Sequence, residues 1–162
     1  MNREHHYKGT IQWTGNNGEG TTTYRAYERS YTFSINNKPD ISGSSDPSFR
    51  GDITKHNPED LLLTSLAACH MLSYLHVCSV AGVVVIEYVD HATGTMVETS
   101  NGSACFKEVT LNPVVTVKDK TMINKANELH KEANALCFIA NSVNFPVYHI
   151  PTSNVKSSND GL

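Results

Sequence analysis

Hydrophobic residues along the chain form one long block and several shorter alternating runs. The block, residues 57–81, is apolar on almost every face of a helix, which is typical of a helix that is covered on most sides. Asn57 suits the N-cap, Pro58 the first helical position, and Gly82 the end of a helix. The pattern predicts a central helix over these residues, covered by other elements or by a second subunit.

Polar residues interrupt this block often enough to disfavour a membrane span, which needs ~18 or more nearly uninterrupted apolar residues. The formal net charge is −3 and no basic block occurs, so nucleic acid is not expected as a partner. The N-terminus lacks the apolar core of a secretory signal. The four cysteines have no regular spacing, and these features together predict a cytoplasmic, reducing location.

The alternating runs predict β-strands before and after the central helix. These strands are expected over residues 7–13, 83–98, 103–117 and 144–150, and residues 21–35 are expected to form two strands or one strand broken by a bulge. Asn101-Gly102 predicts a hairpin turn, and Pro113 predicts a bulge or an edge position. Between the first strands and the central helix, residues 36–56 are rich in Gly, Pro, Ser and Asp, which predicts a long loop of a kind that is often functional.

A second helix is predicted over residues 121–140, because apolar residues recur there at helical spacing. Residues 1–151 are expected to form a single domain, and residues 152–162 a polar, disordered tail. Segregated strands and helices in this order favour an α+β fold with an antiparallel sheet.

The cysteines admit two interpretations from the residues alone. A thiolate stabilised by a nearby cation can attack a peroxide to form a sulfenic acid, which a second cysteine converts to a disulfide. Cys69, in the central helix, and Cys137, near the end of the second helix, are candidates for such a pair. Free cysteine is also among the most buried residue types, and on these grounds alone a core role is favoured for both.

The remaining candidates are assigned more simply. Cys78 lies about 180° round the helix from Cys69, which indicates a core residue, and Cys105 is interpreted as structural. His70 is predicted to be a buried, hydrogen-bonded histidine. Leu72 and Leu75, with Tyr74, could line an apolar pocket, but a place in the core is favoured. No zinc-binding motif occurs.

Two motifs resemble the OsmC/Ohr family of osmotically inducible and organic-hydroperoxide-resistance proteins. NPEDLLLTSLAACH has a Pro-Glu helix start ten residues before a cysteine, and LHKEANALCFIANSVNFPV is similar to the segment that holds the family's second cysteine. The segments WTGNNGEGTTTYRAYERSY and GSSDPSFRGDITKHNPEDLL resemble one OsmC-like subgroup. The resemblance extends over roughly residues 7–151.

The resemblance implies an intertwined homodimer in which antiparallel sheets wrap two central buried helices. It also implies thiol-dependent reduction of organic hydroperoxides, with hydrogen peroxide as a further candidate substrate. By position, Cys69 would attack the peroxide, Cys137 would resolve the sulfenic acid, and Glu59 would orient an arginine. Arg50 matches the OsmC pattern best. Arg25 and Arg29 are alternatives, since the hydroperoxide-resistance group takes its arginine from nearer the N-terminus.

No metal or prosthetic group is implied, and an external dithiol or lipoyl-type compound is the expected reductant. Glu59 and Cys69 are ~15 Å apart along one straight helix, so a bridging arginine or a second subunit must connect them. This places the expected active site at a dimer interface. Two other functions stay open: a non-enzymatic dimer that binds an apolar ligand, and a general thiol–disulfide oxidoreductase.

Overall fold

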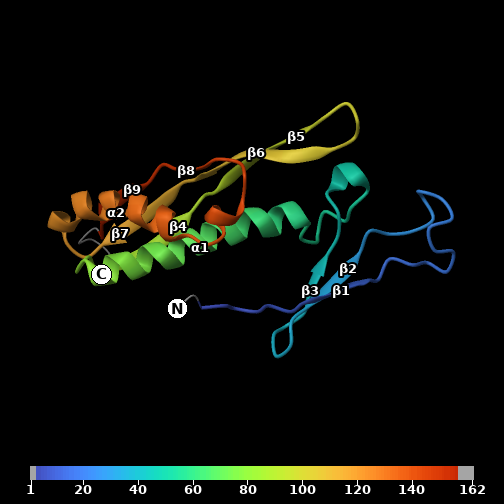
Figure 1. Cartoon of the computed structure of the whole chain (residues 1–162), viewed down its shortest axis with the longest axis horizontal. Helices are drawn as coiled ribbons and strands as arrows, with labels where there is room; N and C mark the ends of the chain where they lie inside the picture. Colours follow the sequence, from blue (N-terminus) through green and yellow to red (C-terminus); the bar gives the residue numbers. More distant parts are fainter. Residues whose placement is uncertain (1–2, 157–162) are drawn as a thin grey trace, which may run out of the picture. The chain divides into compact units, whose positions relative to one another are not determined.

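The computed structural model describes residues 3–156. The chain divides into two compact units, Met1–Leu62 and Leu63–Leu162, and the boundary falls inside the long helix α1, Pro58–Val80 (Figure 1). Two α-helices and three small sheets make up the described residues, which confirms the predicted α+β class. The single domain over residues 1–151 stays a prediction.

The first unit contains an antiparallel sheet in the order β1-β2-β3. Its strands are β1, Thr10–Trp13, β2, Tyr31–Ser34, and β3, Ile41–Gly43. β3 and the short 3-10 helix η1, Pro47–Phe49, lie inside the segment that was predicted as one long loop. The prediction of one loop over residues 36–56 missed these two elements. Both are only three residues long and are surrounded by Gly, Pro, Ser and Asp, which are typical of turns.

Residues 18–26 form turns and bends in place of the first strand predicted within 21–35. The Asn16 side chain accepts hydrogen bonds from the backbone N–H groups of Gly18 and Gly20. The Arg29 guanidinium lies 4.2 Å from the ring centroids of both Tyr24 and Tyr27. These local contacts order the segment without a partner strand, and hydrophobic alternation alone does not reveal them.

Helix α1 begins and ends close to where the sequence predicts. The Asn57 side chain accepts the backbone N–H of Asp60 at 2.7 Å, which confirms the N-cap. At the other end Gly82 has φ +74°, and the Val83 N–H donates to the Cys78 carbonyl at 2.9 Å. This is the left-handed C-terminal turn that favours glycine.

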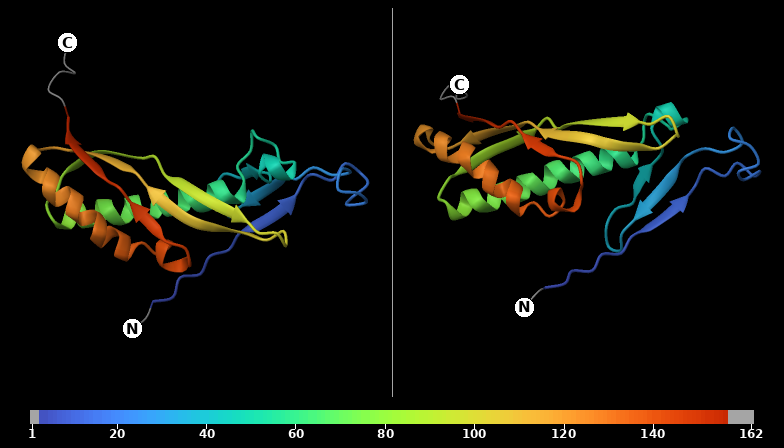
Figure 2. Two further views of the ribbon diagram at one scale, coloured as in Figure 1. Left: turned by 90° about the horizontal axis from the view of Figure 1, so that it is seen from above. Right: turned by 45° about the horizontal axis from the view of Figure 1, so that its top comes forward.

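Four strands of the second unit are β4, Val85–Asp90, β5, Thr93–Glu98, β6, Ala104–Leu111, and β7, Pro113–Val117. β4 pairs with β7 and β5 pairs with β6. Because β5 follows β4 and β7 follows β6 along the chain, the two pairs form one long antiparallel ribbon that runs beside α1 (Figure 2). β5 and β6 form the predicted hairpin, with Gly102 at φ +80°. Pro113 is neither at a bulge nor at an edge: it is the first residue of β7, the middle strand of its sheet. A first position needs no N–H donor, so proline is tolerated there.

Two further strands correct the prediction of a purely antiparallel sheet. β8, Val147–His149, pairs in parallel with β6, and β9, Thr152–Val155, pairs in parallel with β7. The predicted disordered tail therefore begins with a strand. β9 is an edge strand, where polar residues are tolerated, and its Asn154 is hydrogen-bonded to Thr116 across the sheet at 3.0 Å. Residues 157–162 lie outside the described part of the chain.

The second helix, α2, Ile123–Leu136, follows the 3-10 turn η2, Lys120–Met122, and ends before the predicted residue 140. A further 3-10 turn, η3, Ala140–Ser142, follows it. The main core cluster joins α1, α2, β4 and β7 and includes Tyr74, Val77, Val115, Val117, Ala126 and Leu129. A smaller cluster packs Leu66 of α1 against Val109 and Leu111 of β6.

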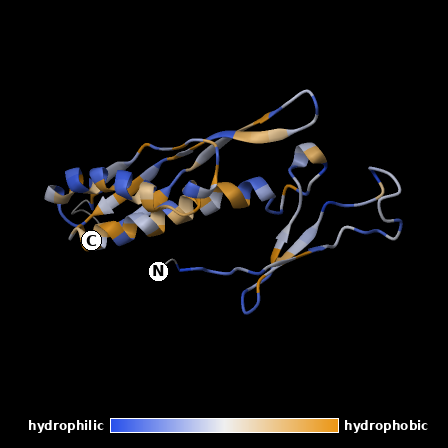
Figure 3. Cartoon of the chain, viewed as in Figure 1, coloured by the Kyte–Doolittle hydropathy of each residue, from blue (hydrophilic) through white to orange (hydrophobic). Residues whose placement is uncertain are grey.

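Hydrophobic residues recur along α1 (Figure 3), and several of them are exposed within this chain. Leu72 is 63% exposed and Leu75 36% exposed, so the prediction that both belong to the core is wrong for a single chain. By length and composition alone α1 could cross a membrane, a test that core helices of soluble proteins also pass. A cytoplasmic location stays a prediction.

Candidate active site around Cys69 and Cys137

Cys69 and Cys137, far apart in sequence, lie near one another in the second unit, where backbone N–H groups of the same turn approach both sulfurs and the two thiols interact. Cys69 lies on α1, and Cys137 is the residue directly after α2, where the backbone becomes extended. Both are free thiols. The structure therefore brings together the two cysteines that the sequence identifies as a candidate pair.

The turn that follows α2 directs one backbone N–H at each sulfur. The Ile139 N–H donates to Cys69 Sγ at 3.5 Å, and the Ala140 N–H donates to Cys137 Sγ at 3.4 Å. The Asn141 N–H also donates to the Cys137 carbonyl at 3.0 Å, which holds the turn closed. A hydrogen-bond donor at sulfur stabilises the thiolate relative to the thiol. The turn therefore offers stabilisation to a negative charge on either sulfur.

The two thiols differ in their surroundings. Cys137 is 1% exposed, and burial, with the hydrogen bond to Cys69 as a further cause, raises the pKa of its thiol to about 11. Cys137 is thus a protonated thiol at neutral pH. Cys69 is partly exposed. Of this pair, Cys69 is the sulfur that a small molecule from solvent can approach.

His70 and His130 form a second buried pair next to the thiols. Both are fully buried, and His70 Nε2 lies 3.0 Å from His130 Nδ1. The His130 ring stacks on the Tyr74 ring with 3.8 Å between centroids, and His149 of β8 lies beside both imidazoles. Burial lowers the pKa of His70 to about 4 and that of His130 to about 3, so both are neutral near pH 7. The prediction of a buried, hydrogen-bonded His70 is confirmed.

Within residues 3–156, no group of three or more His, Cys, Asp or Glu side chains is arranged to hold a metal ion. Aromatic stacking and the single hydrogen bond account for the contacts between His70 and His130.

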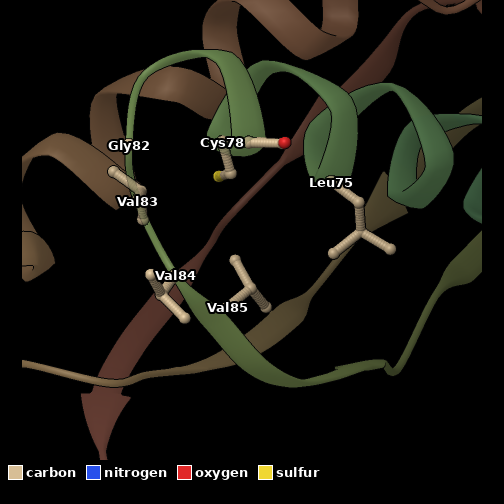
Figure 4. Close-up of a pocket in the computed structure, with 7 residues that line it drawn as sticks. Leu75, Cys78, Gly82, Val83, Val84 and Val85 are labelled. Atoms are coloured by element: carbon tan, nitrogen blue, oxygen red, sulfur yellow. The ribbon is translucent and has the colours of Figure 1, made fainter.

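Cys78 is 1% exposed, which confirms its prediction as a core residue. Burial raises the pKa of its thiol, so it stays protonated. It lies at a pocket of about 310 Å³ where α1 ends and β4 begins, beside Leu75 and Val83 (Figure 4). Cys105 is exposed on β6 opposite Val97.

Glu59 lies in the first turn of α1, ten residues before Cys69, and its Oε2 atom is buried without a hydrogen-bond partner. None of Arg25, Arg29 and Arg50 forms an ion pair with Glu59 among the described residues. The arrangement expected from the resemblance, a Glu59-bound arginine, is therefore absent from the described part of this single chain.

The three candidate arginines differ in how they are engaged. The Arg29 guanidinium donates to the Tyr27 and Tyr24 carbonyls, at 2.5 and 2.7 Å, besides lying over both rings. Arg50 is exposed directly after η1, with φ +66°. Arg25 is also exposed. Arg29 would have to give up these contacts to bind a carboxylate, whereas no side-chain contact of this kind engages Arg50 or Arg25 among the described residues.

An apolar pocket of about 590 Å³ lies in the first unit, where β1 and β2 meet the start of α1. Its lining residues are Ile11, Tyr31, Phe33, Pro58 and Leu61. The pKa of Tyr31 is raised, first by burial and then by the charges of Glu59 and Asp60. The pocket therefore combines an apolar wall with a nearby acidic helix start.

Sequence reasoning missed three groups around the thiols. His130 shares the buried face of α2 with Ala126, Leu129 and Ala133, and its helical spacing could have identified it as a buried polar residue. The backbone N–H groups of Ile139 and Ala140 leave no signal in the sequence. Any residue type except proline would supply them.

Comparison with protein families finds that the model described as "OsmC-like protein" matches residues 51–149. This range includes Glu59, Cys69 and Cys137. No curated protein matches the chain.

Solved structures resemble the chain along nearly its whole length. An OsmC-like protein of unknown function from Vibrio cholerae is 25% identical, with a TM-score of 0.82 over 92% of this chain and 100% of the other. An organic hydroperoxide resistance protein from Elizabethkingia anophelis is 18% identical, with a TM-score of 0.71 over 95% and 100%. The organic hydroperoxide resistance protein OsmC from Legionella pneumophila is 16% identical, with a TM-score of 0.68 over 95% and 100%. The fold is therefore the one these proteins share.

Proposed function

Because the chain belongs to the OsmC-like protein family, we propose that it reduces organic hydroperoxides through Cys69 and Cys137. Family membership and the likeness to two organic hydroperoxide resistance proteins support a role in peroxide resistance. One observation supports the finer assignment: a partly exposed thiol lies beside a buried, protonated one. That asymmetry suits an attacking Cys69 and a resolving Cys137.

The reaction proceeds in three balanced steps. The Cys69 thiolate attacks the terminal oxygen of the hydroperoxide; the O–O bond breaks, the alcohol leaves with one proton, and Cys69 becomes a sulfenic acid. The Cys137 sulfur then attacks the Cys69 sulfur, and the Cys137 proton leaves with the hydroxyl group as water. An external dithiol or lipoyl-type compound donates two electrons and two protons to restore both thiols. No metal or prosthetic group takes part.

The cation that assists Cys69 is assigned to a second copy of the chain. The buried, unpaired Oε2 atom of Glu59 supports this, since a buried carboxylate oxygen without a donor is costly. Arg50 is the preferred donor and Arg25 the alternative, because both guanidinium groups are exposed. The partly bare apolar face of α1 supports a homodimer around this helix. The active site then lies at the dimer interface.

Stopped-flow oxidation by cumene hydroperoxide tests the proposal, with hydrogen peroxide as a second substrate. Wild-type thiol is expected to react at least ~100-fold faster than free cysteine, Cys69→Ser to lose this phase, and Cys137→Ser to accumulate a trappable sulfenic acid. Wild-type reaction at the rate of free cysteine would refute the peroxidase. If glutathione disulfide then oxidised the pair rapidly, a general thiol–disulfide oxidoreductase would replace it.

Single Arg50→Ala, Arg25→Ala and Arg29→Ala variants identify the assisting cation in the same assay. Only one of them is expected to slow oxidation of Cys69 at saturating reductant. Arg29→Ala serves as the control, since its guanidinium is already bound to backbone carbonyls. Equal rates in all three variants would remove the arginine from the proposal.

A second candidate function is binding of an apolar ligand without chemistry. The pocket beside β1, β2 and the start of α1 favours it, because its volume of about 590 Å³ lies in the range of small-molecule sites. Titration with a fluorescent fatty acid tests this reading. Saturable binding that Phe33→Asp abolishes, without peroxide reactivity, would support it over the peroxidase.

A further inference from the structure

A series of contacts joins α1 to the segment that carries Cys137. Farthest from the thiols, the Tyr74 hydroxyl donates to the Ala126 carbonyl at 3.1 Å. Next, His70 Nε2 and His130 Nδ1 share a hydrogen bond of 3.0 Å. At the thiols, the Ile139 N–H donates to Cys69 Sγ at 3.5 Å. Each contact links α1 with α2 or with the turn that follows it. The histidine pair is the middle member of this series.

The histidine pair leaves polar atoms unsatisfied. His70 Nδ1 and His130 Nε2 are buried and have no hydrogen-bond partner in the described structure. In a neutral pair one ring donates through the shared bond and the other accepts. Whichever tautomer is present, one buried N–H and one buried lone pair remain unpaired. Two well-packed apolar side chains would avoid that cost, so stability does not explain this pair.

Its place in the chain suggests a different role. His70 directly follows Cys69 on α1, and His130 lies on α2 about two helical turns before its end, which Cys137 directly follows. The bond between them joins the two helices from which the thiols are presented. Its direction is also specific, because it requires a donor on one ring to meet an acceptor on the other, whereas apolar packing tolerates small shifts along the helix axes.

We propose that the His70–His130 hydrogen bond is a positioning contact that holds the end of α2 against α1 and so keeps Cys137 within reach of Cys69. This inference rests on the proposed use of the two cysteines as a disulfide-forming pair. Both histidines are positioning residues, since neither is assigned contact with a substrate. Without the bond, the last turn of α2 moves more freely and the thiols meet less often. Because the freer turn must become ordered before the disulfide can close, the effective concentration of one thiol at the other is lower.

A glutathione redox titration measures this effect without any peroxide. One glutathione disulfide oxidises the Cys69–Cys137 dithiol to the disulfide and yields two reduced glutathione molecules, so the equilibrium constant reports how well the thiols are positioned. The titration uses the full-length protein in the Cys78→Ser, Cys105→Ser background, which leaves one pair to titrate.

The variants are chosen by the atoms that form the bond. His130→Phe keeps a ring to stack on Tyr74 but removes the hydrogen bond. His130→Asn keeps a polar atom near the position of Nδ1, and His70→Gln keeps one near the position of Nε2. We expect the equilibrium constant to fall about tenfold in His130→Phe, which corresponds to about 30 mV. In His130→Asn and His70→Gln it should stay within about twofold of the parent protein.

Two results would overturn the inference. An unchanged constant in His130→Phe would show that the bond does not position the thiols. An equal fall in His130→Asn and His130→Phe would show that loss of the imidazole, and not of the bond, is responsible. Circular dichroism checks folding; if His130→Phe does not fold, His70→Leu and His70→Gln give the same comparison from α1.

The outcome is separable from that of the proposed function. If cumene hydroperoxide fails to oxidise Cys69 but the glutathione constant still falls in His130→Phe and recovers in His130→Asn, the peroxidase fails and the positioning role stands. If peroxide oxidation is fast but the glutathione constant is the same in every variant, the peroxidase stands and the positioning role fails.

Discussion

Acidification should destabilise the folded chain through His70 and His130. Their pKa values are lowered from 6.5 to about 4 and about 3, first by burial and then by the charges of neighbouring histidines, His149 of β8 among them. Between these values and 6.5 the unfolded chain binds protons that the folded chain excludes. The free energy of unfolding therefore rises with pH across this window. The full contribution is present above pH ~6.5 and is lost as the pH falls toward the folded-state values.

The size of the effect follows from these values. Between about pH 7.5 and about pH 5, an unfolded-state pKa of ~6.5 and a folded-state pKa near 4 give a loss of about 2 kcal/mol for each histidine. The loss for the two histidines together is then about 4 kcal/mol, which is large beside the ~5–15 kcal/mol by which domains are stable. Asp90 acts in the opposite direction, because burial raises the pKa of its carboxyl.

Urea unfolding followed by far-ultraviolet circular dichroism measures this loss, at both pH values and at one protein concentration. The matched variant is the double substitution His70→Gln, His130→Asn, which keeps hydrogen-bonding groups but removes both titrating rings. Its free energy of unfolding should change by about 4 kcal/mol less than that of the wild type between the two pH values. Equal changes in the two proteins would refute the reasoning, since Asp90 and all other titrating groups are common to both.

Three further substitutions have expected outcomes. Asn57→Ala removes the side chain that caps α1 and should lower the free energy of unfolding by about 1 kcal/mol in urea titrations, with Asn57→Asp as the control that keeps the cap. Gly51→Ala places a Cβ 1.6 Å from the Ser45 carbonyl oxygen, so the turn after η1 must rearrange. In urea titrations the free energy of unfolding should fall by about 1–3 kcal/mol. If Arg50 assists Cys69, peroxide oxidation should also be slower. Leu72→Asp puts a charge on the bare face of α1 and should convert the proposed dimer to monomers in light scattering, whereas a dimer that survives would place the interface elsewhere.

Local signals predicted the parts of the fold that depend on neighbours in sequence. The ends of α1 follow from Asn57 and Gly82, because a cap and a left-handed residue act within one turn of the helix. The β5–β6 hairpin follows from Asn101-Gly102 for the same reason. These predictions needed no knowledge of what the elements pack against.

Predictions that depended on distant partners were less successful. β9 was taken for a polar tail because its strand character comes from pairing with β7, and its own residues alternate too weakly to show it. Leu72 and Leu75 were assigned to the core because a helix that is apolar all round gives no sign of which face its own chain covers. Of the strands predicted within 21–35, β2 is present, but the first is replaced by turns that the contacts of Asn16 and Arg29 hold.

The sequence by itself determined the long apolar helix, its caps, the α+β class and the family resemblance that singled out Cys69 and Cys137. Only the tertiary structure decided that these sulfurs lie near one another, that one is buried and protonated while the other is partly exposed, and that two backbone N–H groups face them. It also revealed His130 as the partner of His70. The physical reason is that burial, pKa and hydrogen bonding depend on groups that are close in space but distant along the chain.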